Sequence, residues 1–164
     1  IEDDFQRDRK ALYQIIKLGR RLNLEKTTSL DDIFNYASEL IYETFPSADR
    51  VTLVLLNSEQ NGYLPAYINQ KRAGKHQRTQ SIPTGPILDR VTAERVSLVF
   101  GDLRRESNSY PGLSVSDVRS ALFVPLWNGE DILGVLEVDD CRHRDAFGRE
   151  EMNILTTFGL ELAL

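Results

Sequence analysis

The spacing of apolar residues predicts two helices in the first part of the chain. In residues 5–24, leucines and isoleucines recur at helical intervals after a charged start. Residues 30–45 keep a helical period throughout, with apolar side chains at Leu30, Ile33, Phe34, Ala37, Leu40, Ile41 and Phe45. Thr28 or Ser29 can cap this second helix, and Pro46 ends it.

A continuous apolar run at residues 51–56 predicts a strand that is covered on both faces, and therefore a central strand. Asn61-Gly62 is a turn signal, so residues 63–69 are expected to return as its antiparallel neighbour. The middle of the chain then predicts three short elements, which are a strand at 79–82, a helix at 84–94 opened by Pro86, and a strand at 96–100.

Residues 121–140 predict a β-hairpin, because two apolar runs are joined by Asn128-Gly129-Glu130-Asp131. Pairing across an even-numbered turn places Ser120 on the same face as Glu137, and brings the two side chains close together. A buried carboxylate needs a partner or a ligand. Glu137 is therefore expected to bind a donor-bearing ligand or an arginine such as Arg104, or to be hydrated at the end of the sheet.

The order of elements indicates one α+β domain. Residues 103–117 are polar and long for a plain connection, which favours a lid over the sheet. Gly148 and Glu151 begin a closing helix that carries Met152, Leu155, Phe158 and Leu162. We expect residues 1–24 to form an N-terminal linker helix and residues 25–164 the domain, with both ends cut as in an excised module.

Composition and charge exclude several classes of protein. The chain has 164 residues with a formal net charge of −5, which argues against a nucleic-acid interface. The basic stretch 70–78 is expected to be a solvated loop. No apolar run is long enough to cross a membrane and no signal peptide is evident, so a cytoplasmic location is the default.

Motifs for catalysis are scarce, so no enzyme activity, cofactor or metal is expected. There is no phosphate-binding glycine loop and no nucleophile elbow. Cys141 and His143 are two residues apart in a charged segment, where neighbouring side chains rarely face one another. With one cysteine and two histidines, the sequence offers no disulfide and no evident metal site.

The chain resembles a GAF domain, the small-molecule sensing module of many signalling proteins. The resemblance is carried, in order, by residues 29–45, residues 50–57, "VRSALFVPL" with "GEDILGVLEVDD", and "FGREEMNILTTFGLELAL". It implies an α+β fold with a central antiparallel sheet of five or six strands. The terminal helices would cover one face, and a mixed helix and loop segment would cover a ligand pocket on the other.

The motifs of family members with known ligands or activities can be compared with the residues of this chain. Members that bind bilins use a cysteine in the middle segment or in an Asp-x-Cys motif, whereas Cys141 follows the last strand. The free methionine sulfoxide reductases of this fold need more than one redox cysteine. Members that bind cyclic nucleotides carry Asn-Lys after the last strand, where this chain has Asp140-Cys141, although Phe147 and Glu151 of the following motif remain. Cyclic-nucleotide binding is therefore only weakly supported.

The resemblance implies a non-catalytic regulatory module that senses a ligand within a larger bacterial signalling protein, such as a kinase, cyclase or transcriptional activator. Ligand binding would reach the output domain through the terminal helices. The alternative is a ligand-free domain that only dimerises its parent. In the first case, the expected ligand-binding residues are Tyr67, Phe100, Asp102, Arg104, Tyr110, Ser120 and Glu137.

A homodimer through the terminal helices is the first testable expectation. Apolar residues of 5–24 are spread too widely for one narrow seam, and the closing helix adds further apolar positions. The apolar side chains of these helices that stay exposed would form a two-fold contact between two copies of the chain. Sedimentation velocity should show a dimer at high micromolar concentration, and a strict monomer under those conditions would contradict the expectation.

Overall fold

The computed structural model describes residues 29–57, 62–72, 76–115 and 117–163. The helix expected at 5–24 lies outside these residues. The described elements are, in order, α2 (Leu30–Thr44), β1 (Arg50–Asn57), β2 (Gly62–Tyr63), β3 (Ala66–Gln70), β4 (His76–Thr79), α3 (Gly85–Glu94), β5 (Leu98–Phe100), the 3₁₀ helix η1 (Leu103–Arg105), β6 (Ser120–Trp127), β7 (Ile132–Asp140) and α4 (Arg149–Ala163).

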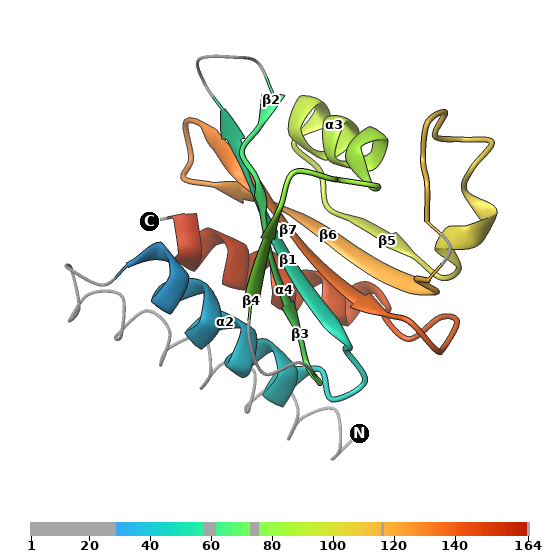
Figure 1. The fold of residues 1–164 in the computed structure, drawn as a ribbon, viewed down its shortest axis with the longest axis horizontal. Helices are drawn as coiled ribbons and strands as arrows, with labels where there is room; N and C mark the ends of the chain where they lie inside the picture. Colours follow the sequence, from blue (N-terminus) through green and yellow to red (C-terminus); the bar gives the residue numbers. More distant parts are fainter. Residues whose placement is uncertain (1–28, 58–61, 73–75, 116, 164) are drawn as a thin grey trace.

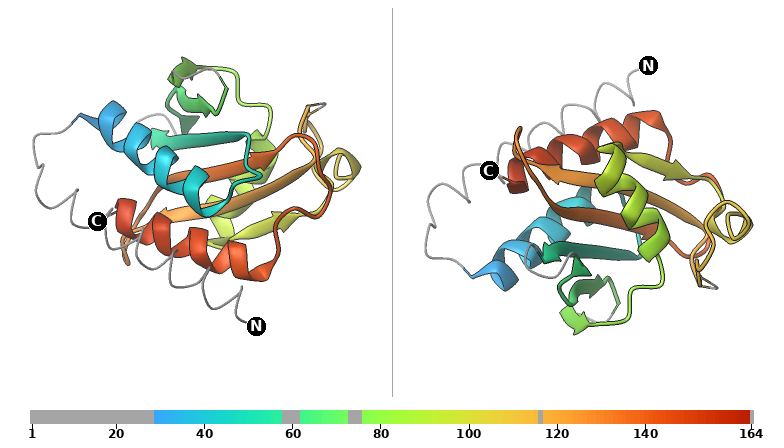
Figure 2. Two further views of the ribbon diagram at one scale, coloured as in Figure 1. Left: turned by 90° about the horizontal axis from the view of Figure 1, so that it is seen from below. Right: turned by 90° about the horizontal axis from the view of Figure 1, so that it is seen from above.

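The strands form an antiparallel sheet, which confirms the expected α+β fold. Its order is β4-β3-β1-β7-β6-β5, and the short strand β2 pairs with the end of β1. Helices α2 and α4 cover one face of this sheet (Figures 1 and 2). Helix α3 and the mixed segment that follows β5 lie on the other face, as the family resemblance implied. The sheet therefore has two distinct sides, called below the α2/α4 side and the α3 side.

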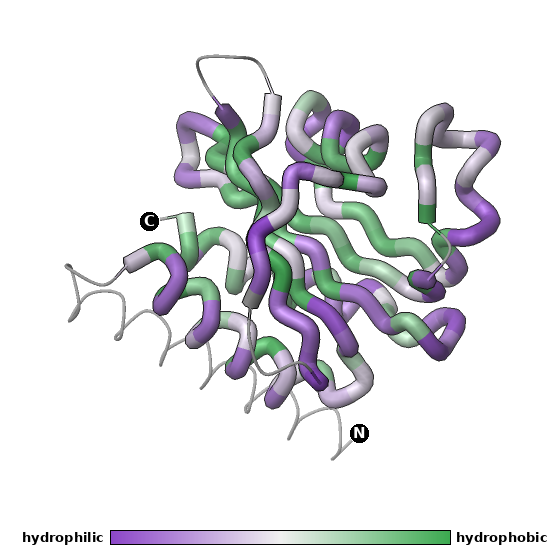
Figure 3. The backbone as a smooth tube through the Cα atoms, viewed as in Figure 1, coloured by the Kyte–Doolittle hydropathy of each residue, from purple (hydrophilic) through white to green (hydrophobic). Residues whose placement is uncertain are grey.

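The three helices begin where the sequence predicts, and capping contacts hold the starts of α2 and α4. The Ser29 hydroxyl accepts a hydrogen bond from the backbone N–H of Asp32 at 3.2 Å, which satisfies one free donor of α2. Helix α3 starts after Thr84 with Pro86 in its first turn. Glu151 accepts from the backbone N–H of Gly148 at 3.1 Å and so holds the start of α4. Figure 3 shows hydrophobic and hydrophilic positions alternating along α2, as its one-sided burial requires.

Each side of the sheet has its own hydrophobic cluster. On the α2/α4 side, Leu136 and Val138 of β7 pack among residues of α2 and α4 such as Phe34 and Phe158. On the α3 side the fully buried residues include Ile87, Leu88, Leu103, Val118, Ala121 and Phe123. Because successive residues of a strand point to opposite faces, β7 contributes to both clusters in alternation.

The expected register of the hairpin is wrong by one residue. Trp127 pairs with Ile132 as an even-numbered turn requires, but Leu126 pairs with Gly134, so Leu133 is the extra residue of a β-bulge. Beyond the bulge every β7 side chain changes face relative to the expected pairing. Glu137 lies opposite Phe123, and Ser120 lies opposite Asp140.

Three other boundaries differ from the expectation. The strand expected at 79–82 is instead β4, so part of the stretch expected as a solvated loop is an exposed edge strand. The expected strand 63–69 is divided into β2 and β3, because Pro65 cannot donate to the ladder. Strand β5 begins only at Leu98.

Gly134 provides a test of the sheet register. A Cβ atom at this position would lie 2.2 Å from the backbone oxygen of Val54, because β1 and β7 approach closely there. Gly134→Ala should therefore lower the free energy of unfolding by about 1–3 kcal/mol, as overpacking typically does. Urea denaturation measures the change. Gly85→Ala is the matched control, since its Cβ would meet nothing within 4 Å, and equal losses in the two variants would contradict the register.

Candidate functional site

Two carboxyl groups are buried side by side on the α3 side of the sheet. Glu137 and Asp139 are two residues apart on β7, so their side chains lie on the same face of the sheet. Their exposed fractions are 4% and 0%. Arg50 lies directly across the sheet on β1, where its Nε donates to Oδ2 of Asp139 at 2.9 Å. The Nη1 of Arg50 also reaches Asp117 at 3.1 Å. The Thr84 hydroxyl at the start of α3 donates to Oε1 of Glu137 at 3.0 Å.

The surroundings favour a protonated Glu137. Burial and the neighbouring charge of Asp139 raise the pKa of Glu137 well above its ordinary value. Burial also raises the pKa of Asp139, but there the hydrogen bond with Glu137 and the charge of Arg50 act in the opposite direction. Oδ1 of Asp139 is buried and accepts no hydrogen bond from a described N–H or hydroxyl group. A protonated Glu137 could supply the missing donor, and the pair would then carry a single negative charge beside Arg50.

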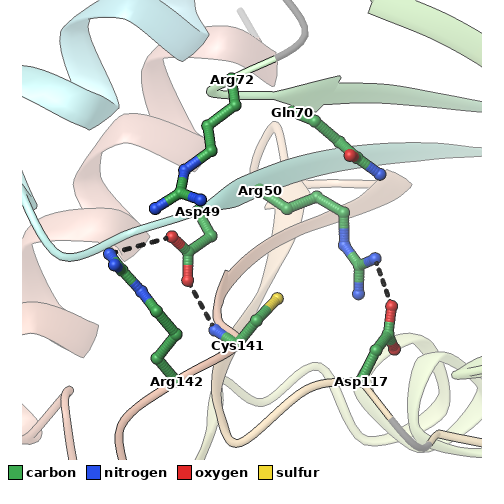
Figure 4. A pocket seen from close by; sticks show the side chains of 7 residues that line it. All are labelled: Asp49, Arg50, Gln70, Arg72, Asp117, Cys141 and Arg142. Carbon is green, nitrogen blue, oxygen red and sulfur yellow. Dashed lines mark hydrogen bonds and ion pairs between the residues drawn. The ribbon is translucent and has the colours of Figure 1, made fainter.

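This pair lies beside two hollows, which share Arg50 and Asp117 in their walls. The inner cavity measures about 90 Å³ and is lined by Glu137, Thr84 and apolar residues of β3 and the loop before α3. The outer cleft measures about 300 Å³ and lies where β1 begins and β3 and β7 end. Its lining residues, shown in Figure 4, are Asp49, Arg50, Gln70, Arg72, Asp117, Cys141 and Arg142.

Three of the seven expected ligand-binding residues lie on the α3 side. Glu137 lines the inner cavity. Phe100 and Tyr110 pack edge to face in the α3-side cluster with 5.7 Å between ring centroids. The Tyr110 hydroxyl accepts from Arg90 at 2.6 Å. Both aromatic rings are part of the hydrophobic core on this side and do not line the inner cavity.

Tyr67 and Ser120 instead belong to the α2/α4 side. The Tyr67 ring lies 5.7 Å from that of Phe34. The Ser120 hydroxyl contacts the backbone oxygens of Gly101 and His143 and accepts from the N–H of Ala146 at 3.0 Å. The expectation that Ser120 lies beside Glu137 is therefore wrong, because the bulge at Leu133 reverses the relation of their faces.

Asp102 and Arg104 lie near the end of β5 and do not reach Glu137. Asp102 caps η1 and makes ion pairs with Arg105, Arg119 and Arg144 at 3.2–3.5 Å. Arg104 is exposed, so the expected pair between Arg104 and Glu137 is wrong. Arg50 is the arginine beside the buried carboxyl groups.

Arg50, Thr84 and Asp139 were missed by the sequence reasoning. Glu137 and Asp139 are two residues apart in a strand, so their common face was readable from the sequence. Arg50 stands at the start of the predicted central strand, but its partner depends on the order of strands in the sheet. That order has no local signal.

Cys141 and His143 do not form a nucleophile and base pair. Burial raises the pKa of the Cys141 thiol to about 11, and its backbone N–H donates to Asp49. Nδ1 of His143 lies 3.0 Å from Asp140. In the described part of the chain, no group of three or more His, Cys, Asp or Glu side chains is placed to hold a metal ion. No helix within those same residues is both long and apolar enough to cross a membrane.

The sequence matches a family model, and the fold is similar to those of several solved structures. The model of the GAF domain family matches residues 29–164. No curated protein matches the sequence. Among solved structures, the GAF domain of an Acinetobacter phosphoenolpyruvate-protein phosphotransferase is 17% identical with a TM-score of 0.70, over 93% of this chain and 89% of that one.

A second similar structure is the free methionine-R-sulfoxide reductase of Neisseria meningitidis in complex with its substrate. It is 18% identical with a TM-score of 0.69, over 94% of this chain and 88% of that chain. At these identities the likeness shows the fold alone.

The buried proton on Glu137 predicts a specific dependence of stability on pH. Below about pH 4.5 the folded and unfolded states both hold this proton, whereas at higher pH only the folded state keeps it. The free energy of unfolding should therefore fall as pH rises toward the raised pKa, by up to about 1.4 kcal/mol per pH unit. Glu137→Gln keeps the shape and both hydrogen bonds but removes the titration. Urea denaturation from pH 5 to 8 should show the variant gaining stability relative to the parent.

Asp139→Asn is the contrasting variant in the same series. It removes the buried carboxylate of Arg50 and leaves only the exposed Asp117 as its partner, so a loss of about 3–5 kcal/mol is expected across the pH range. Stability curves of Glu137→Gln and the parent that run parallel with pH would show that Glu137 is ionised in the folded state.

Proposed function

This chain belongs to the GAF family, and we propose that it is a non-catalytic regulatory domain that senses a small molecule for a larger bacterial signalling protein. The parent would be a kinase, a cyclase or a transcriptional activator. The observation that carries the proposal is a carboxyl group, that of Glu137, buried in the wall of a cavity beneath α3. Signalling domains of this kind act in the cytoplasm, which is the location we propose.

The inner cavity favours a compact ligand that donates hydrogen bonds. Its volume of about 90 Å³ is well below the 300–1,000 Å³ typical of sites for drug-sized ligands. A cyclic nucleotide is therefore disfavoured, and a small amine or amide group fits better. Such a group can donate to Glu137, whose carboxyl group lines the cavity together with the hydroxyl groups of Thr84 and Ser81.

Strand β7 offers a direct path from the cavity to the helices. Glu137 faces the cavity, while the adjacent residues Leu136 and Val138 are fully buried among the residues of α2 and α4. A ligand that moves Glu137 must also disturb the packing of these neighbours, because protein interiors are closely packed. Its binding energy would then bias the arrangement of the helices that lead to the output domain.

Two features support a role without catalysis. Cys141 is the only cysteine in the sequence, and its raised pKa of about 11 leaves the thiol protonated at neutral pH. The polar side chains of the inner cavity are engaged with one another, with Thr84 donating to Glu137 and Arg50 bound to Asp117.

The small size of the inner cavity also supports a second candidate, a ligand-free domain that dimerises its parent. Ile87, Leu88 and Phe123 are fully buried on the α3 side, as in a purely structural core. In that case Glu137 and Asp139 would serve only to fix the pairing of β1 with β7 through Arg50.

Thermal denaturation with a panel of ligands separates the two candidates. The panel contains small amines, amides, amino acids, carboxylates and cyclic nucleotides. A ligand present at 100 times its dissociation constant adds about 2.7 kcal/mol of apparent stability. We expect a compact amine or amide to raise the melting temperature, and Glu137→Leu, which removes both side-chain oxygens, to abolish the increase. Glu130→Leu, in the exposed hairpin turn, is the control and should respond as the parent does. No response to any compound would favour the dimerisation domain.

A further inference from the structure

The outer cleft is lined by arginines from three separate parts of the chain. Arg50 comes from the start of β1, Arg72 follows β3, and Arg142 follows β7 (Figure 4). We propose that this cleft binds a small molecule through an oxyanion, either a carboxylate or a phosphate group. The proposed site is distinct from the inner cavity, and it contains none of the residues that the sequence reasoning assigned to a ligand.

The cleft contains hydrogen-bond donors that no described acceptor engages. Arg50 is engaged by Asp117 and Asp139, and Arg142 by Asp49, in a chain whose formal net charge is −5. Arg72 makes no hydrogen bond or ion pair with any described residue, and neither does the side-chain amide of Gln70. A planar guanidinium matches a carboxylate or phosphate with two parallel hydrogen bonds, so an arginine in a concave site that no described carboxylate engages favours such a ligand.

The carboxylates of the cleft are already engaged. Asp49 accepts from the backbone N–H of Cys141 at 2.7 Å and lies 3.4 Å from Arg142. Asp117 binds Arg50 at 3.1 Å. These contacts hold Arg50 and Arg142 in place at the cleft, and they leave little acceptor capacity for a cation. A preorganised site of this kind loses less entropy when a ligand binds.

The volume of the cleft limits the ligand to a small metabolite. About 300 Å³ is at the lower end of the range for ligand pockets, in contrast to the inner cavity. The open position at the end of the sheet allows a strongly hydrated anion to enter without losing all of its water. Binding should therefore weaken as the salt concentration rises.

The reactivity of the Cys141 thiol can report whether a ligand occupies the outer cleft. Its side chain lines the cleft, and Figure 4 shows its sulfur on the same side as the Arg50 side chain. As the only cysteine of the sequence, it gives an unambiguous signal. A ligand bound by the arginines would cover the thiol and slow its alkylation.

The test measures the rate of Cys141 alkylation by iodoacetamide, an uncharged reagent, at fixed pH and fixed ionic strength. Inorganic phosphate and succinate are titrated separately, with sodium chloride replacing them in the control series. We expect one of the two anions to slow the reaction in a saturable manner. Arg72→Gln and Arg142→Gln should each weaken that protection about tenfold, as the loss of a charge-assisted hydrogen bond predicts. Arg149→Gln, an exposed arginine at the start of α4, should leave the protection unchanged.

Each outcome has a defined meaning. Protection by phosphate alone identifies a phosphate-bearing ligand, and protection by succinate alone identifies a carboxylate. The proposal is overturned if neither anion protects, if chloride protects equally, or if protection survives Arg72→Gln unchanged. Arg72 has no described partner, so this variant should fold as the parent does, and an altered melting temperature would direct the comparison to Arg142→Gln.

Discussion

The ion pair between Arg50 and Asp139 is the interaction on which the centre of this domain depends. It joins β1 to β7 at the middle of the sheet, where one side chain is fully buried and the other largely so. Removing Arg50 would leave a buried carboxylate without compensation, and removing Asp139 would leave the guanidinium with only the exposed Asp117. Burial and the neighbouring charge of Asp139 raise the pKa of Glu137, which favours the protonated form and so relieves the repulsion between two carboxylates.

The ion pair between Arg50 and Asp139 explains why further polar side chains lie on the α3 side of the sheet. Thr84 at the start of α3 and Asp117 in the mixed segment both point to the same group of side chains. The opposite side is almost wholly apolar beneath α2 and α4. Arg50 lies in the walls of both the inner cavity and the outer cleft. Ligands in the two proposed sites would therefore lie beside the same charged group.

The bulge at Leu133 decides which side receives that chemistry. Without it, an even-numbered turn would put Glu137 among the residues that pack beneath α2 and α4. There a carboxyl group would have only apolar neighbours, at a large cost in free energy. The one inserted residue directs Glu137 and Asp139 toward Arg50 and Thr84 and leaves Leu136 and Val138 to the hydrophobic core.

Local signals in the sequence determined the elements of this protein. Ser29, Pro86 and Gly148 mark helix ends by chemistry that acts within one turn, and the apolar run after Arg50 marks the central strand, so these elements and the family were predictable. The face of Glu137 was not, because a single bulged residue reverses the alternation without a distinct sequence signal. The outer cleft was not predictable either, since Arg50, Arg72 and Arg142 meet only through the order of the strands. Pairing between strands depends on the packing of the whole sheet, and this is why the tertiary structure alone decided the site.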